Sequence, residues 1–204
     1  PIRKRLLQCK LLGKGLLFIL NKKYFRIFQK EVKMKNKLVF LLKHDDYFNG
    51  VVKLAEKKGS KICYITLNKS CEYLNEKLNV SNFSEGKFYF IDGISPIIKK
   101  SGEVKGCDFI NVSKGFASLM NHVKKALKNG YNTVILDSLS NVLTYSSLKK
   151  TCSFVDVLLD VVKKSGGSLI VFCNKSDEGR VGDSLCISNF KVYKQPSLLF
   201  GTRE

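Results

Sequence analysis

An aspartate at the end of an apolar run is the first residue with clear chemical potential. The segment Thr133–Ser138 reads TVILDS, so Asp137 and Ser138 follow residues typical of a buried strand. An acid at the carboxyl edge of a parallel strand can hold the water shell of a bound Mg²⁺. Ser138 and Ser140 could act as nucleophiles only beside a base, and His122, on a separate predicted helix, has no evident path to them. The segment therefore indicates an acid of the Mg²⁺-binding type.

A second polar group follows another apolar run. His44, Asp45 and Asp46 come directly after residues 37–42, at the sheet edge where ligands bind in open α/β folds. We expect Asp137 on the neighbouring strand, where these side chains together could bind a metal ion. Alternatively, one of the two aspartates caps the next helix, where negative charge is favoured. We favour the helix cap.

The remaining polar motifs favour structural roles. Asp92 precedes Gly93 and is typical of a turn. Residues 174–177 read NKSD and match the guanine-reading pattern N-K-x-D, but no phosphate loop accompanies them, so we interpret the match as chance. The 7 cysteines include no C-x-x-C pair and there are only 2 histidines, so no metal site of the zinc type is expected. Cys63 and Cys173 lie in apolar runs, as in a reduced, cytoplasmic chain.

Short apolar runs alternate with amphipathic segments through most of the chain. The runs lack two-residue alternation, which is typical of parallel strands covered on both faces. Strands are expected at residues 37–42, 61–67, 88–91, 108–112, 132–136, 168–173 and 190–193. Helices are expected at residues 48–58, 70–78, 113–129 and 148–164, with loops at 95–106 and 174–183. The pattern predicts an α/β domain, a three-layer αβα arrangement with a mainly parallel sheet, over residues 37–195, between an extension at 1–36 and a tail at 196–204.

The ordered set of segments resembles the RecA/KaiC-like P-loop ATPases, especially the archaeal KaiC-like group. TVILDSLS (133–140) resembles their Walker B strand, ICYITLNKS (62–70) their second strand and the turn after it, and FYFID (88–92) their third strand. The resemblance extends over roughly residues 37–193. It implies a RecA-like sheet in which Asp137 is the acid associated with Mg²⁺.

Two parts of that family's catalytic machinery are missing from this sequence. The phosphate loop G-x-x-x-x-G-K-[ST] should follow the first strand, but residues 43–52 read KHDDYFNGVV and keep only Gly50. The loop's glycines let backbone N–H groups hold the phosphates, whereas two aspartates would repel them. The family's catalytic Glu corresponds to Asn68 or Lys69, neither of which can act as the base. The resemblance therefore implies a pseudo-ATPase without a cofactor, Mg-ATP remaining an alternative, with a vestigial nucleotide site at His44, Asp45, Asp46, Gly50, Asn68, Asp137 and Ser138.

The charge of the chain favours polyanionic partners. The formal net charge is +19, and residues 1–37 carry twelve basic residues against one acid, Glu31. Leu and Phe interleave with these cations, which suits a helix docked on the domain or on a partner, then single-stranded nucleic acid, then peripheral contact with an anionic membrane. No segment is long and apolar enough for a transmembrane helix. The basic arm's candidate binding residues are Arg3, Lys4, Arg5, Lys22, Lys23 and Arg26.

Three functions are compatible with the sequence. The first, which we favour, is a non-catalytic RecA/KaiC-like domain that acts as a regulatory or scaffold module by binding a protein partner or a second copy of itself. The second is a residual nucleotide-binding protein or atypical ATPase that uses Asp137. The third is a nucleic-acid-binding protein that works through its basic N-terminal arm.

Overall fold

A computed structural model describes residues 36–41, 47–98, 104–112, 115–182 and 190–193 of the chain. These residues belong to one compact unit, Asn36–Glu204. None of its described helices is long and apolar enough to cross a lipid bilayer.

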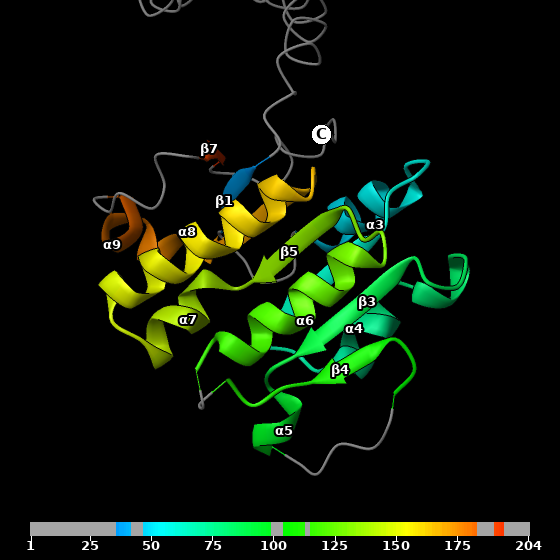
Figure 1. The fold of residues 1–204 in the computed structure, drawn as a ribbon, viewed down its shortest axis with the longest axis horizontal. Helices are drawn as coiled ribbons and strands as arrows, with labels where there is room; N and C mark the ends of the chain where they lie inside the picture. Colours follow the sequence, from blue (N-terminus) through cyan, green and yellow to red (C-terminus); the bar gives the residue numbers. More distant parts are fainter. Residues whose placement is uncertain (1–35, 42–46, 99–103, 113–114, 183–189, 194–204) are drawn as a thin grey trace, which may run out of the picture. The chain divides into compact units, whose positions relative to one another are not determined.

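Seven strands form one sheet in the order β4-β3-β2-β5-β6-β1-β7 (Figure 1). Every pairing between these strands is parallel, as the short apolar runs predicted. One expectation was wrong: β6 lies between β1 and β5, so Asp137 is not on the strand next to β1. The strands are β1 (Lys37–Leu41), β2 (Ile62–Thr66), β3 (Phe88–Asp92), β4 (Cys107–Phe109), β5 (Thr133–Asp137), β6 (Ser168–Asn174) and β7 (Lys191–Tyr193).

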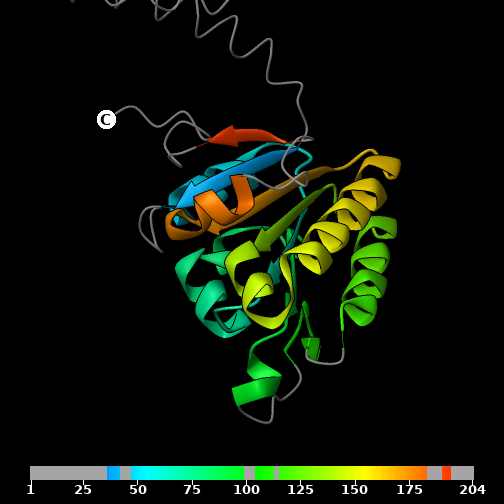
Figure 2. The same cartoon turned by 90° about the vertical axis from the view of Figure 1, so that its left-hand side faces the viewer.

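Helices cover both faces of the sheet, which confirms the three-layer αβα fold (Figure 2). One face packs against α6 (Ala117–Lys128), α7 (Leu139–Tyr145) and α8 (Leu148–Lys164), and the other against α3 (Phe48–Glu56) and α4 (Cys71–Lys77). Side chains of β2 alternate between the two helical layers. Cys63 and Ile65 face the layer of α6, α7 and α8, whereas Ile62 and Tyr64 face that of α3 and α4. Because both faces are dry, the strand reads as a continuous apolar run.

Local sequence signals set the ends of the longer helices. The Ser70 hydroxyl accepts a hydrogen bond from Tyr73 N at the start of α4, and Ser147 does the same for Lys150 N at the start of α8. Helix α3 differs from the expectation, because Tyr47 rather than Asp45 or Asp46 occupies its N-cap position and makes no side-chain capping bond.

Several short elements were not predicted. Helices α5 (Ser95–Ile98) and α9 (Glu178–Gly182) lie in segments expected to be loops, as does the 3₁₀ helix η4 (Lys175–Asp177), while η2 (Val80–Asn82) and α7 were not anticipated. The sequence of α7, LSNVLTY, has weak helix propensity, but Leu139, Val142 and Leu143 are buried in the core. Tertiary packing therefore decides its conformation. Two predicted bounds were also wrong. Strand β4 ends at Phe109 rather than at residue 112, and helix α6 begins at Ala117 rather than at residue 113.

Candidate functional site

The carboxyl ends of three neighbouring strands bring two acids to one edge of the sheet. Thr66, the last residue of β2, is level with Asp92 on β3 and with Asp137 on β5. All three side chains are buried. This is the edge at which parallel α/β sheets bind ligands.

Asp137 is surrounded by hydrogen-bond donors from the protein itself. The hydroxyls of Tyr47 and Tyr64 both donate to its Oδ2, that of Tyr64 at 2.7 Å. Asn68 Nδ2 donates to Oδ1 at 3.1 Å. The carboxylate is 0% exposed, so these bonds replace the hydration that it loses on folding.

Lys69 supplies a positive charge to the same cluster. Its Nζ lies 3.9 Å from Asp137 Oδ2 and donates to the Tyr47 hydroxyl at 3.0 Å. The ammonium also lies 5.4 Å from the centre of the Tyr47 ring and 5.6 Å from that of Phe48. A buried carboxylate is tolerated when it is both paired and hydrogen-bonded, and this one is both.

A tight turn after β2 places Asn68 and Lys69 against Asp137. The Thr66 hydroxyl donates to Lys69 O at 2.6 Å and accepts from Lys69 N at 3.2 Å. Leu67 N donates to the backbone oxygen of Asp137 at 2.7 Å, which joins the turn to the end of β5. Both side chains that reach the carboxylate from this turn are therefore held by backbone contacts.

Tyr47 reaches Asp137 although β6 separates their strands. Its side chain is 0% exposed, and its ring centre lies 4.5 Å from that of Phe172 on β6. The ring therefore packs over the intervening strand and presents its hydroxyl to the acid on β5. Residues 43–52, where the resemblance would place a phosphate loop, thus contribute a buried aromatic side chain to the site.

Burial and the nearby negative charge keep the Tyr64 hydroxyl protonated, so that it can donate a hydrogen bond. Complete burial, and then the negative charge of Asp137 and the proximity of Tyr47, raise the pKa of Tyr64 well above its usual value. Tyr64 therefore stays protonated and remains a hydrogen-bond donor to Asp137 at any pH near neutrality.

The structure brings together some of the predicted site residues and not others. Asn68 and Asp137 are in contact, but Gly50 is buried within α3 and the Ser138 hydroxyl donates to Asn141 Oδ1 at 2.6 Å. His44, Asp45 and Asp46 lie outside the described residues, as do the candidate residues of the basic arm.

Sequence reasoning missed the two tyrosines that donate to Asp137. Tyr47 lies in residues 43–52, which were compared only with a phosphate loop, and Tyr64 lies within the apolar run of β2. A signal was present, because a tyrosine in a fully buried strand needs a partner for its hydroxyl.

The serine–histidine alternative finds no support in the geometry. His122 Nδ1 lies 2.7 Å from Asp108 Oδ2, and Ser140 Oγ instead accepts from Asn174 N at 2.8 Å. Although partial burial acts to raise it, hydrogen bonds from Tyr89 and His122 hold the pKa of Asp108 below its usual value.

Asp92 and the NKSD segment at residues 174–177, which the sequence did not assign to a ligand site, both make local structural contacts. Asp92 Oδ1 accepts from Ile94 N at 2.9 Å and Ser95 N at 2.8 Å, which confirms the turn. In the NKSD segment, Lys175 pairs with Glu178, and Asp177 pairs with Arg180 at 3.3 Å. Local ion pairs therefore use its charged side chains.

No protein-family model matches the sequence, and no curated protein matches it. Among solved structures, the fold is similar to that of a KaiC-like protein from the hyperthermophilic archaeon Pyrococcus horikoshii OT3. The TM-score is 0.49 at 14% sequence identity, over 69% of this chain and 61% of that chain. The similarity is one of chain arrangement and says nothing of activity.

Replacing Lys69 by Met should destabilise the protein through Asp137. The substitution leaves a buried carboxylate without its cation, and we expect the free energy of unfolding to fall by about 1–3 kcal/mol. Lys53→Met, on the exposed side of α3, is the matched control and should change stability by less than about 0.5 kcal/mol. Urea unfolding measures both.

The double-mutant cycle tests whether the loss acts through the charge. In an Asp137→Asn background the same Lys69→Met change should cost much less, because no carboxylate remains to be neutralised. Equal losses in the two backgrounds would show that Lys69 contributes only by packing.

Proposed function

We propose that this chain is a non-catalytic RecA/KaiC-like domain that works as a regulatory or scaffold module through a protein partner. The observation that supports the proposal is the environment of Asp137. The acid that would face Mg²⁺ in an active relative instead accepts hydrogen bonds from three side chains and faces an ammonium.

The described residues around Asp137 do not fit a hydrated Mg²⁺. Mg²⁺ takes oxygen ligands in a near-ideal octahedron and usually keeps several of its waters. Asp137 is 0% exposed, and two hydroxyls already donate to its Oδ2. An incoming ion would have to displace these hydroxyls and approach the positive charge of Lys69.

The chain after β1 also differs from a phosphate-binding loop where it is described. Val51 N donates to Tyr47 O at 3.0 Å, so this amide belongs to the first turn of α3 rather than to an anion cradle. The Tyr47 side chain meanwhile turns inward to Asp137. Both features support a site that is closed by its own residues.

A filled site favours a function at the molecular surface. A fold does not fix a function, and an αβα domain whose ligand edge is filled can act by contact with another chain. An active homologue or a second copy of this chain is the partner that the RecA/KaiC-like resemblance suggests.

Mg-ATP should leave the thermal stability of the protein unchanged. A ligand that binds the folded state at 100 times its Kd stabilises it by about 2.7 kcal/mol, which would raise the melting temperature by several degrees. We expect no such rise by differential scanning calorimetry up to millimolar Mg-ATP.

A nucleotide-dependent rise in melting temperature would contradict the proposal. If Asp137→Ala then abolished that rise, the chain would be a residual nucleotide-binding protein that uses this acid. Mg²⁺ and ATP added separately are the controls for ion and polyanion effects.

A polyanion-binding function is the second candidate, and one surface favours it. Helix α6 contains no acidic residue, and Lys124, Lys125 and Lys128 line a surface hollow of about 380 Å³ together with Asn121 and Asn129. Nucleic-acid phosphates are the ligands that such a lysine row would contact. The basic arm adds charge of the same sign.

Charge removal at α6 should weaken retention of single-stranded nucleic acid if this second function holds. Replacing Lys124, Lys125 and Lys128 together by Gln should lower the affinity for single-stranded nucleic acid. The slope of log K against log salt concentration should become shallower by about 0.7 per lost phosphate contact. Lys57, Lys58 and Lys77→Gln, on the α3 and α4 layer, is the matched control.

The contribution of the arm is separable by deletion. The deletion should end at residue 35, because Asn36 Oδ1 accepts from Leu169 N at 3.2 Å and Asn36 O accepts from Lys191 N at 3.2 Å within the domain. Retention that survives both the deletion and the α6 variant, or that does not depend on salt, would count against this function.

A further inference from the structure

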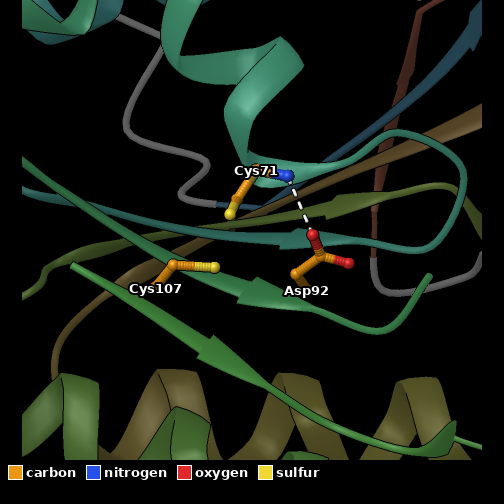
Figure 3. Close-up of side chains that lie close together, drawn as sticks. All are labelled: Cys71, Asp92 and Cys107. Carbon is orange, nitrogen blue, oxygen red and sulfur yellow. Dashed lines mark hydrogen bonds between the residues drawn. The ribbon is translucent and has the colours of Figure 1, made fainter. Parts of the chain in front are cut away.

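Two cysteines and an aspartate from three different elements converge on one buried point. Cys71 is the first residue of α4, Asp92 the last of β3 and Cys107 the first of β4. One ligand atom from each, two sulfurs and a carboxylate oxygen, lie within 4.8 Å of one another, and all three residues are buried. Figure 3 shows both sulfurs directed into the space between the residues.

Backbone pairing holds this arrangement in place. The register of β3 and β4 puts Phe90 level with Cys107, so Cys107 is beside the residue two positions before Asp92 and on the same face. Cys71 N donates to Asp92 Oδ2 at 2.8 Å and fixes the start of α4 against the end of β3 (Figure 3). The three side chains are therefore positioned before any ligand arrives.

We propose that Cys71, Asp92 and Cys107 form a binding site for a thiophilic divalent ion of the zinc class. Two thiolates and a carboxylate are ligands that Zn²⁺ takes in proteins. Tetrahedral zinc with sulfur at about 2.3 Å and oxygen at about 2.1 Å places its ligand atoms roughly 3.6–3.8 Å apart. The three atoms need only small side-chain adjustments to reach these separations.

A fourth ligand is available on α4, beside Cys71. Glu72 is exposed, and its Oε2 is 3.8 Å from Cys71 Sγ. Its carboxylate, or a water molecule on the same side, completes a tetrahedral site.

The hydrogen bonds of Asp92 suit a ligating carboxylate. Its Oδ2 accepts from the Ser95 hydroxyl at 2.7 Å, which can rotate away and free a lone pair for the ion. The backbone N–H groups of Cys71, Ile94 and Ser95 continue to donate to the carboxylate and orient it. Hydrogen bonds of this kind, made to the atoms of a ligating side chain, hold it in the orientation that the ion needs.

The site is independent of the proposed function. Strand β2 separates β5, which contains Asp137, from β3 and β4. An ion at the new site would connect α4, β3 and β4. Its ligands are separated by 21 and 15 positions in the sequence, which is why a search for C-x-x-C spacing did not find it.

Cobalt provides the spectroscopic probe. The 204-residue chain, freed of metal and reduced with a non-thiol reductant, should bind Co²⁺ with a thiolate-to-cobalt charge-transfer band and the intense visible bands of tetrahedral coordination. Both should saturate at one equivalent and disappear when Zn²⁺ is added. Cys71→Ser and Cys107→Ser should each lower the charge-transfer band at least twofold, whereas Cys152→Ser, on α8, should leave it unchanged.

A measurement on the unmodified protein guards against variants that fail to fold. In mild urea, where local opening exposes the two buried thiols, Zn²⁺ should slow the alkylation of Cys71 and Cys107, but not that of Cys152, as mapped by mass spectrometry. The proposal is overturned if Co²⁺ gives no charge-transfer band, if the band survives in both Cys71→Ser and Cys107→Ser, or if Zn²⁺ leaves the alkylation of both cysteines unchanged.

Discussion

A carboxylate that folding removes completely from water must be neutralised and hydrogen-bonded, and the arrangement around Asp137 follows from this requirement. Three segments that are distant in sequence satisfy it. The chain after β1 contributes Tyr47, strand β2 contributes Tyr64, and the turn after β2 contributes Asn68 and Lys69. The carboxyl edge of the sheet is thereby closed by the protein's own side chains.

The same requirement makes two uses of Asp137 mutually exclusive. A carboxylate that coordinates hydrated Mg²⁺ needs open lone pairs and access to water. Asp137 has no access to water, and displacing a hydroxyl from its Oδ2 to admit the ion would leave that hydroxyl buried without its partner. The absence of a phosphate-loop sequence from residues 43–52 and the filled surroundings of Asp137 are thus physically consistent with one another. Both features agree with the proposal that this edge of the sheet does not bind Mg-ATP.

Much of the fold, and Asp137 at the edge of the sheet, could be predicted from local patterns, whereas most of the side chains around Asp137 could not. Helix α8 has the predicted bounds because its apolar spacing and the Ser147 cap are properties of the segment itself. The parallel sheet follows in the same way from runs that lack alternation. Helix α7 and the position of β6 between β1 and β5 depend on contacts across the chain, so no local pattern indicated them. The partners of Asp137 and the cluster of Cys71, Asp92 and Cys107 depend on strand register in the same way, and residue types alone did not reveal them.

The account rests on Asp137 being satisfied internally and therefore closed to Mg²⁺. The most direct measurement is the side-chain carboxyl ¹³C resonance of Asp137, assigned with Asp137→Asn, during titration with Mg²⁺ and with Mg-ATP. The account predicts that this resonance keeps its position throughout both titrations. A saturable shift of the Asp137 resonance with either ligand would contradict it.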